Sequence, residues 1–282
     1  MSKEYTEIVE GLSHPIKIRD YLKNKLGFST ALIAKVKYDN VLLNGKAVHM
    51  RAMVENGDEI KIIFPTEESE NIPPIEMPLD IIYEDEDIIA INKPINMPVH
   101  PCRGNHLPTL ANGLRHYLNR PFVFRSVNRL DRDTSGIVIV AKNQLSAIRL
   151  CRQMAENHFK KIYFARVVGV PEEDGIIDAP IARQSPDSLI RVVREDGKRS
   201  ITEYKRVQVF EDGTSLVKVI LHTGRTHQIR VHMSYIGHPL VNDFLYGEQE
   251  GDKPYFLHCK EITFTHPTTG EEVTLISKMP NI

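Results

Sequence analysis

The chain has 282 residues, of which 41% are hydrophobic and 26% are charged, as is typical of a globular protein with a sizeable core. No apolar run approaches the roughly 20 residues of a membrane-spanning helix, and the opening MSKEYTEIVEG lacks a signal-peptide core, so we expect a cytoplasmic protein. Three widely separated cysteines, Cys102, Cys151 and Cys259, indicate neither a disulfide framework nor a zinc site.

Charge is distributed unevenly along the chain, although the formal net charge is only −1. Residues 15–52 contain eight Lys or Arg and two acidic residues, a local balance of +6. Residues 66–92 contain nine acidic residues and no Lys or Arg. Because phosphate contacts are made by local patches, the basic segment indicates a nucleic-acid partner despite the near-neutral total.

The first 72 residues predict a loose tail, over residues 1–13, followed by a small domain. Apolar spacing over residues 16–37 predicts two short helices separated near residues 27–30. Residues 41–46 predict a strand entering an Asn-Gly hairpin turn, and residues 54–62 a second turn and strand. This order resembles the alpha-L type RNA-binding module of the ribosomal small-subunit protein four family and implies an RNA-binding domain over residues 14–72. A small domain with a solvated basic helix face stays open as the alternative.

An acidic, proline-containing segment over residues 67–78 predicts an extended linker, with a second domain over residues 78–282. Apolar runs at residues 79–83 and 88–92 predict two strands, and residues 109–118 and 145–156 predict helices. Residues 160–169 predict a strand whose alternation places Tyr163 on one face. The segment 170–215 predicts short hairpins, whose basic side chains either contact RNA or form a solvated surface.

The second domain is expected to be organised around residues 127–142, VNRLDRDTSGIVIVAK. A charged turn that contains Arg129, Asp131 and Arg132 precedes an apolar run at 137–141, whose β-branched residues predict a buried strand. Gly136 permits a tight backbone entry into that strand. The turn would hold the Asp131 carboxylate at the mouth of a sheet, where neighbouring guanidinium groups would keep it ionised. That suits a nucleophile or an electrostatic stabiliser.

A second block rich in Arg, His and Gln follows the expected strand at residues 216–221. It reads HTGRTHQIRVH over residues 222–232. Its apolar spacing predicts a helix whose start Thr226 can cap. Arg225 is therefore expected at a strand-to-helix junction, close to a helix N-terminus.

Together these stretches resemble the RluA-type family of ribosomal large-subunit pseudouridine synthases. The turn N-R-L-D-R-D-T-S-G follows the family signature except that Asn128 replaces its histidine, and N-K-P-I-N-M-P-V-H-P follows another family loop except that Asn96 replaces a glycine. Asparagine tolerates the left-handed backbone that this glycine position needs. Family pieces also match at K-I-Y-F-A-R-V-V-G, T-G-R-T-H-Q-I-R-V-H, G-H-P-L-V-N-D-F-L-Y-G and F-T-H-P.

The resemblance implies an α+β fold in which the small helix-helix-hairpin RNA-binding domain precedes a catalytic domain. That catalytic domain would be a mixed, mainly antiparallel β-sheet with flanking helices. The implied activity is the isomerisation of specific uridines to pseudouridine, in large-subunit ribosomal RNA, without metal or cofactor.

The resemblance also implies roles for four residues. Asp131 would supply the carboxylate, either as covalent nucleophile or as the base that initiates elimination. Arg225 would pair with Asp131 and hold it ionised and oriented, while Tyr163 would lie beside the uracil and handle the final proton. Arg129 would occupy the stack that the flipped uridine leaves.

Three other functions stay open at this point. The chain could be a transfer RNA pseudouridine synthase, or an RNA-binding protein of the same fold without turnover, an idea motivated by Asn128 and Asn96. It could also be an aspartyl-phosphate phosphatase, because residues 131–134 read D-R-D-T. In such phosphatases the motif follows a hydrophobic strand, whereas here the apolar strand comes after it. The default expectation for the oligomeric state is a monomer.

Overall fold

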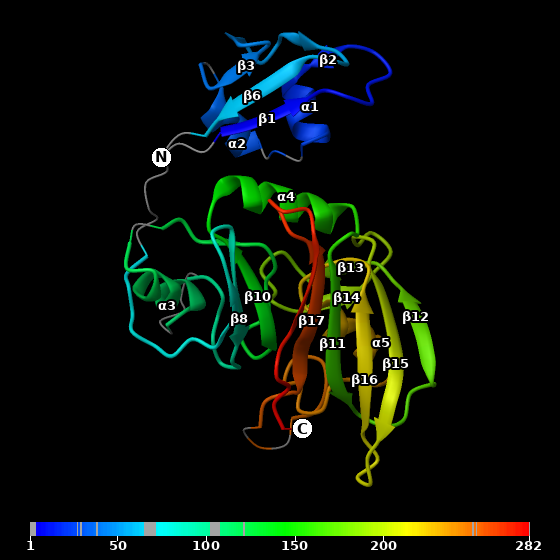
Figure 1. Cartoon of the computed structure of the whole chain (residues 1–282). Coiled ribbons are helices and arrows are strands. Elements are labelled where there is room, and N and C mark those ends of the chain that lie inside the picture. The colour runs from blue at the N-terminus through cyan, green and yellow to red at the C-terminus, as the bar shows by residue number, and fades with distance from the viewer. Residues whose placement is uncertain are drawn as a thin grey trace.

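The computed structural model describes residues 4–26, 28, 30–37, 39–64, 72–101, 108–120, 122–249, 251 and 253–281. Two units of secondary structure follow one another along the chain, and Figure 1 shows the first in blue and cyan above the second. Most of the expected linker, residues 65–71, lies outside the described residues. In the part of the chain that is described, no helix has the length and apolar character to cross a bilayer.

The first unit packs two short helices, α1 (Ile18–Asn24) and α2 (Thr30–Val36), against a four-stranded sheet. The sheet has the order β1-β6-β3-β4, formed by β1 (Glu4–Ile8), β6 (Glu59–Ile63), β3 (Val41–Leu43) and β4 (Lys46–Ala47). Two further short strands, β2 (Ile16–Lys17) and β5 (Met53–Val54), pair with each other. The two helices and the Asn-Gly hairpin agree with the sequence prediction, since both Asn44 and Gly45 have positive φ.

The expected loose tail over residues 1–13 is wrong for residues 4–8, because β1 pairs with β6 along its whole length. The strand is polar, with alternating exposed and half-buried residues. Its main anchors are backbone hydrogen bonds and a 2.6 Å bond from the Tyr21 hydroxyl to the Glu7 carboxylate. Backbone pairing of this kind leaves little hydrophobic pattern to read in a sequence.

A ten-stranded sheet forms the centre of the second unit. Its main path is β12 (Asp174–Asp178), β15 (Ile201–Val209), β16 (Ser215–Leu221), β11 (Lys160–Val167), β17 (Leu257–Thr265), β10 (Ser135–Ala141), β8 (Ile88–Lys93) and β7 (Ile81–Glu84). Off this path, β18 (Glu272–Ile276) pairs with β17 and β9 (Arg125–Ser126) with β10. The described pairs are antiparallel except for the central pair β10 and β17, so the sheet is mixed and mainly antiparallel, as predicted.

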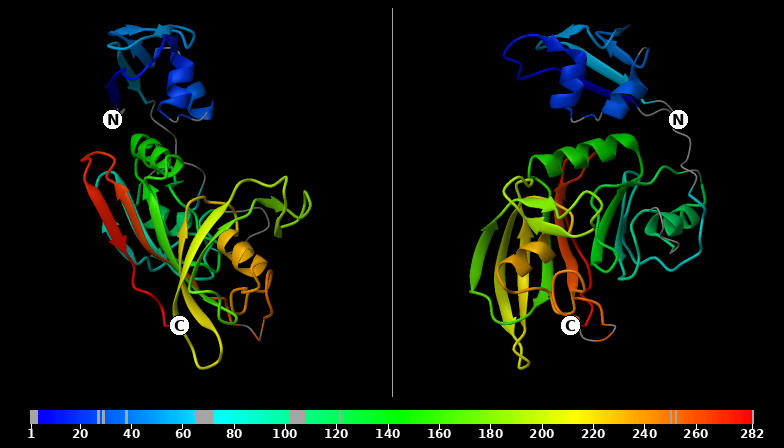
Figure 2. Two further views of the ribbon diagram at one scale, coloured as in Figure 1. Left: turned by 90° about the vertical axis from the view of Figure 1, so that its right-hand side faces the viewer. Right: turned by 180° about the vertical axis from the view of Figure 1, so that it is seen from behind.

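Three helices flank this sheet: α3 (Leu110–Tyr117), α4 (Gln144–Ala155) and α5 (Gln228–Tyr235). In Figure 2, α5 lies on one face of the sheet, beside the hairpin formed by β13 (Ile181–Arg183) and β14 (Arg191–Val193). Helix α4 lies next to the first unit, where Leu145 and Ile148 pack against its core and the Arg149 guanidinium stands 5.3 Å from the centroid of the Tyr5 ring.

The parallel contact between β10 and β17 depends on Gly136. This glycine has φ of 109°, and a Cβ atom there would lie 2.2 Å from the carbonyl oxygen of Cys259. All seven residues of β10 are buried, which confirms the strand predicted for residues 137–141. The charged turn that precedes β10 is therefore fixed at the end of the most deeply buried strand.

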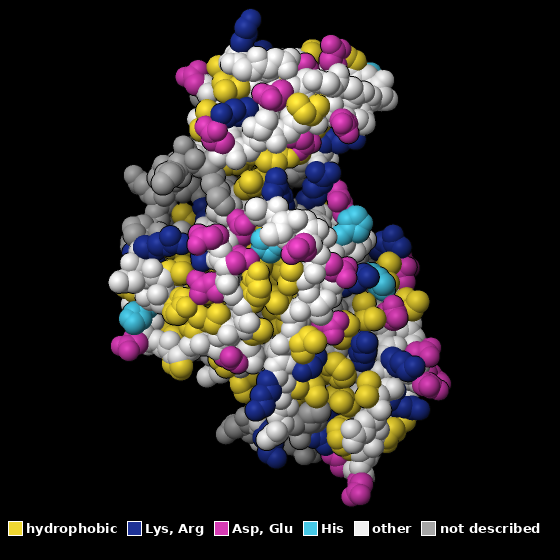
Figure 3. All heavy atoms as spheres, viewed as in Figure 1, with side chains coloured by type: hydrophobic (Ala, Val, Ile, Leu, Met, Phe, Trp, Pro, Cys, Tyr) yellow, Lys and Arg dark blue, Asp and Glu magenta, His cyan; other side chains and the backbone are white. Residues whose placement is uncertain are grey.

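The surface carries both signs of charge. On the face shown in Figure 3, acidic and basic side chains are interspersed over both units. Helix α5 lies toward the opposite side, as the rear view in Figure 2 shows. The start of α5, which belongs to the block rich in Arg, His and Gln, therefore lies on that side of the sheet.

Candidate active site

A cleft of about 850 Å³ opens where the turn before β10 faces β11 and the start of α5. It contains all four residues that the sequence singled out: Arg129, Asp131, Tyr163 and Arg225. Segments almost 100 residues apart in the chain thus form one site. The details of their pairing differ from the prediction.

Lys93, at the end of β8, anchors the turn before β10 from the protein interior. Its side chain is fully buried, and Nζ donates to the carbonyl oxygens of Pro94 and Met97 at 2.8 Å and of Arg132 at 3.0 Å. Burial lowers the pKa of Lys93 to about 7, although Asp133 and Asp131 oppose this shift. One buried amine therefore ties the loop after β8 to the turn that carries Asp131.

Asn128 fixes the other side of the turn. Its side-chain amide donates to the Ile137 carbonyl and its side-chain oxygen accepts from the Ile139 N–H, both at 2.9 Å. The amide thus acts as an additional pairing partner of β10, which gives a structural role to the residue that stands where the resembled family has histidine. Asn96, in the loop after β8, adopts the left-handed backbone expected of it, with φ of 57°.

Arg230, in the first turns of α5, forms the closest ion pair with Asp131. Its Nη1 lies 3.5 Å from Oδ2 of Asp131, whose side chain is 30% exposed. Its Nε and Nη2 each donate to the buried carboxylate of Asp243 at 2.7 Å. Burial alone would lower the pKa of Arg230, but the bonds to Asp243 and the nearby Tyr255 and Asp131 raise it. The guanidinium is therefore permanently charged.

The predicted pairing of Arg225 with Asp131 is wrong. Arg225 lines the cleft, but its Nε donates to the carbonyl oxygen of Arg199 at 3.2 Å, which turns it toward the loop before β15. The expected capping by Thr226 is also wrong, because α5 begins only after His227, which has a left-handed backbone with φ of 57°. Gln228 stabilises the junction instead, accepting from the Arg225 N–H at 3.0 Å.

His227 is the second group that faces Asp131. Its Nε2 lies 3.9 Å from Oδ2 of Asp131, and its Nδ1 is 2.7 Å from the Tyr246 hydroxyl. That hydroxyl accepts from the Arg191 N–H at 2.9 Å, so donating its own proton to Nδ1 satisfies both bonds. Burial lowers the pKa of His227, with Asp131 opposing. The arrangement favours a neutral imidazole that directs an Nε2–H toward Asp131.

Tyr163 lies on β11, buried opposite Cys259 of β17. Burial raises its pKa well above the usual range, and hydrogen bonding to Cys259 and the charge of Asp131 act in the same direction. Burial likewise raises the pKa of the Cys259 thiol to about 12. Both groups therefore carry their protons at neutral pH.

Comparisons with known proteins agree with this geometry. Residues 87–235 match the family model described as RNA pseudouridylate synthase, which is more than half of the chain. The chain belongs to the RNA pseudouridylate synthase family. It is accordingly an RNA-modifying isomerase, and its mixed sheet is the fold of that family.

Relatives of this synthase cover most of its length. It is 39% identical to the RNA pseudouridine synthase YlyB of Bacillus subtilis, over 87% of this chain and 84% of the relative. It is 38% identical to the ribosomal large subunit pseudouridine synthase D of Vibrio parahaemolyticus, over 86% of this chain and 80% of that one. Among solved structures, human RNA pseudouridylate synthase domain containing 1 matches with a TM-score of 0.62 at 30% identity, over 74% of this chain and 86% of that one.

Membership of the synthase family removes the phosphatase alternative, and the fold gives the physical reason. The strand that adjoins Asp131 is β10, which follows the turn, whereas only the two-residue β9 comes shortly before it. Among the described residues, no group of three or more His, Cys, Asp or Glu is arranged to hold a metal. Cys102, one of the three cysteines of the sequence, lies outside the described residues.

Sequence reasoning missed several side chains of the synthase's cleft, above all Arg230, His227 and Lys161. His227 and Arg230 both belong to the block TGRTHQIRVH that the sequence had singled out, so a signal was present. Lys161 stands two residues before Tyr163 on β11 and so shares its face. Burial lowers the pKa of Lys161, and its side chain lines the cleft beside Gly224.

Proposed function

We propose that this synthase isomerises specific uridines of large-subunit ribosomal RNA, with Asp131 as the reacting carboxylate. The observation that carries the proposal is the charge pattern of the cleft. Among the described residues that line it, Asp131 is the only carboxylate, and five are cationic: Arg129, Arg132, Lys161, Arg225 and Arg230. Such a lining attracts a polyanionic strand and presents one carboxylate to it.

The reaction breaks the bond between ribose and the uracil ring nitrogen, turns the base and rejoins it through a ring carbon. Asp131 would act at the ribose, either by attacking the anomeric carbon or by removing a proton to start elimination. Arg230 of α5 and His227, the residue just before that helix, direct two donors toward the carboxylate. These donors support a fixed orientation of the Asp131 oxygens relative to the sugar.

Tyr163 would contact the detached uracil, and its raised pKa supports a resting state in which its hydroxyl is protonated. In that state it donates a hydrogen bond, and it passes or receives a proton only together with a partner. Arg129 is exposed at the edge of the cleft. That position is compatible with its filling the stack vacated when the uridine flips out, a step that costs a few kcal/mol.

Ribosomal RNA is proposed as the substrate for two reasons. Several relatives, including the one from Vibrio parahaemolyticus, are named ribosomal large subunit pseudouridine synthase D. The segment 14–72 is proposed to be an RNA-binding domain of the alpha-L type, since all eight of its Lys and Arg residues between positions 15 and 52 are exposed. A ribosomal substrate would place the enzyme in the cytoplasm, and monomeric action remains our expectation.

The proposal is tested by mapping pseudouridine in total RNA from cells that lack this protein. The cells are complemented with the wild-type chain or with Asp131→Asn, which removes the charge but keeps the shape. We expect specific sites in large-subunit ribosomal RNA to disappear and to return only with the wild type.

Other outcomes separate the alternatives. Loss of sites confined to transfer RNA would overturn the proposed substrate. Turnover by Asp131→Asn close to that of the wild type would overturn the role of the carboxylate. Tight RNA binding without isomerisation of unmodified ribosomal RNA in vitro would favour a purely binding function.

A further inference from the structure

A second hollow of about 460 Å³, which we call the flanking pocket, adjoins the active-site cleft. The two share Gly224, Arg225 and Thr226 as common lining residues, so Arg225 stands at the boundary between them. The rest of its lining comes from the hairpin β13–β14 and the turn that follows it: Ile181, Ala182, Arg183, Arg191, Asp196, Gly197 and Lys198.

The flanking pocket is strongly cationic. Its described lining holds four basic side chains, Arg183, Arg191, Lys198 and Arg225, and a single carboxylate, Asp196. That carboxylate is engaged by the guanidinium of Arg194, which does not line the pocket. An anion in the pocket would therefore meet three more positive than negative charges.

The walls of the flanking pocket are fixed by bonds within the fold. Arg191 donates its backbone N–H to the Tyr246 hydroxyl, and its Nη1 lies 2.9 Å from the Leu189 carbonyl oxygen. A Cβ atom at Gly197 would lie 2.6 Å from the carbonyl carbon of Ile181, so the turn packs tightly on the hairpin. Because these contacts preorganise the wall, little ordering entropy opposes the binding of a ligand.

The same contacts link the flanking pocket to the catalytic carboxylate. The Tyr246 hydroxyl that accepts from Arg191 also bonds His227, whose Nε2 faces Asp131. A strand of RNA whose uridine enters the active-site cleft would have its neighbouring nucleotides at the rim, next to Arg225. The flanking pocket is the basic surface continuous with that rim.

We propose that the flanking pocket binds a backbone phosphate of the nucleotide that adjoins the flipped uridine. Guanidinium groups match the geometry of phosphate oxygens and hold them through paired hydrogen bonds. Such a contact fixes the position of the strand without reading its sequence. The inference rests on the proposed RNA substrate, and it gives Arg225 a role in substrate binding rather than at the Asp131 carboxylate.

The test compares three variants of the full chain. Arg183→Gln combined with Lys198→Gln removes two charges from exposed lining residues of the flanking pocket. Arg183→Lys combined with Lys198→Arg keeps the charges. Lys205→Gln combined with Lys278→Gln is the matched control, because both lysines are exposed and neither lines the flanking pocket or the cleft. Circular dichroism and thermal melting check that each variant is folded. If the double neutralised variant has a lower melting temperature than the wild type, Lys198→Gln alone replaces it in the binding measurements.

Two quantities are measured. Equilibrium binding of a labelled single-stranded RNA oligonucleotide is followed from low to high salt in an Asp131→Asn background, where turnover is removed. The neutralised variant should lower the slope of log K against log salt by about 0.7, the contribution of one phosphate contact on a single strand. On unmodified large-subunit ribosomal RNA, it should raise KM about tenfold, while the charge-preserving variant and the Lys205/Lys278 control stay within about twofold.

The proposal is overturned if the neutralised variant binds RNA with the same salt slope as the Lys205/Lys278 control. It is also overturned if the charge-preserving variant is as defective as the neutralised one, because shape and not charge would then matter. A chain that shows the expected slopes but isomerises no RNA would defeat the proposed function and leave the phosphate site standing. Normal isomerisation by a neutralised variant whose salt slope is unchanged would defeat the phosphate site and leave the proposed function standing.

Discussion

Arg230 binds Asp243 through two hydrogen bonds of 2.7 Å, and the two side chains are only 3% and 0% exposed. Tyr246 and Tyr255 place their rings 5.0 and 4.5 Å from the guanidinium carbon. With Nε and Nη2 held in this way, Nη1 has a fixed direction, toward Asp131. Asp243 therefore orients the charge at the Asp131 carboxylate, although Asp243 does not line the cleft.

Asp243→Asn should be damaging to both fold and catalysis. It leaves the Arg230 charge buried without its partner, which typically costs about 3–5 kcal/mol of unfolding free energy. Urea unfolding measures this cost, and single-turnover isomerisation should slow about tenfold or more because Nη1 loses its fixed direction. Asp212→Asn is the control, because Asp212 is 54% exposed where it pairs with Arg166, and its loss should cost at most about 1 kcal/mol. Equal losses of stability and of isomerisation rate in Asp243→Asn and Asp212→Asn would refute the orienting role of Asp243.

Arg230→Lys and Arg225→Lys separate the two arginines of the α5 block. Lysine is a point charge that cannot hold Asp243 with two parallel bonds and still reach Asp131. We expect Arg230→Lys to lower kcat about 100-fold, the scale of a lost preorganised donor. Arg225→Lys should act mainly on RNA binding. Steady-state kinetics on unmodified ribosomal RNA distinguishes them, and a kcat defect confined to Arg225→Lys would restore the pairing expected from the sequence.

Gly136→Ala should prevent the parallel pairing of β10 with β17. The added methyl group would stand 2.2 Å from the Cys259 carbonyl oxygen, which is backbone and cannot rotate away, and φ of 109° is strained for alanine. We expect insoluble protein or a loss of more than about 4 kcal/mol in unfolding experiments. Gly213→Ala is the control, since Gly213 has φ of 78° but open space around it, and should cost about 1 kcal/mol. Tolerance of Gly136→Ala would mean that the two strands can separate without cost.

The sequence was sufficient for the turn and strand around Asp131 because the signals there are local. The polar turn, the glycine and the apolar run are contiguous, and each has a direct physical meaning in the fold. Asn96 shows the same principle, since its left-handed backbone follows from its own residue type. The two helices and the hairpin of the first unit were likewise encoded by nearby residues.

Which arginine pairs with Asp131 could not be predicted from local sequence signals. It depends on where α5 begins, and that is decided by the left-handed backbone of His227 and by the contact of Gln228 with the Arg225 N–H. Asp243, which orients Arg230, is thirteen residues further along and contributes through tertiary packing. β1 is a similar case, because its partner β6 begins about fifty residues later in the chain.

Because of His258, the free energy of unfolding should decrease as the pH falls through a defined window. It is fully buried between the hydroxyls of Ser135 and Ser277, at 2.9 and 2.7 Å. Burial lowers its pKa to about 4, and Lys260 acts in the same direction. Because the unfolded chain has a histidine pKa of about 6.5, it binds more protons between these values. The stabilisation is therefore present above about pH 6.5 and is lost as the pH falls toward 4.

The measurement is urea unfolding of the wild type and of His258→Asn between pH 7 and pH 4. The stability difference between the two proteins should shrink by about 3 kcal/mol over this range. His14→Gln is the control, since His14 is exposed, and its difference from the wild type should stay nearly constant. A constant difference for His258→Asn would show that protonation of this histidine is not coupled to folding.

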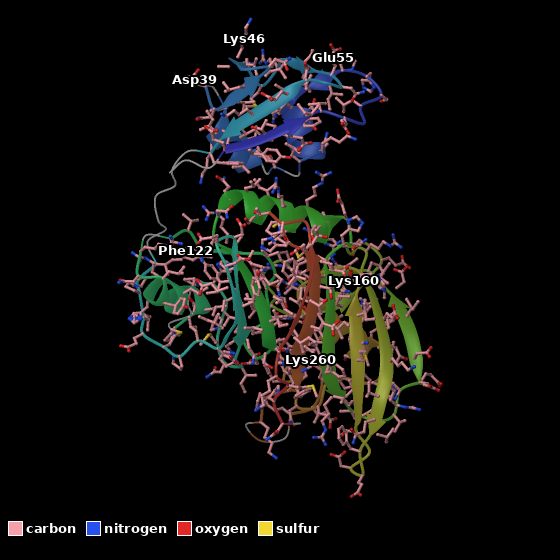
Figure 4. The ribbon with its side chains drawn as sticks, in the orientation of Figure 1. Asp39, Lys46, Glu55, Phe122, Lys160 and Lys260 are labelled. Carbon is pink, nitrogen blue, oxygen red and sulfur yellow. The ribbon has the colours of Figure 1, made fainter. Side chains whose placement is uncertain are left out.

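Neutralising lysines of the first unit should flatten the salt dependence of RNA binding. Lys23 and Lys46 are exposed, and Figure 4 shows Lys46 projecting from the side of the first unit away from the second. If this unit holds phosphates, Lys23→Gln with Lys46→Gln should lower the slope of log K against log salt by about 1.4 on a single-stranded probe. Lys205→Gln with Lys278→Gln is the matched control, because both lysines are exposed and neither lines the cleft. Equal slopes for the two double variants would mean that the basic residues of the first unit form only a solvated surface, and RNA affinity would then have to come from the second unit.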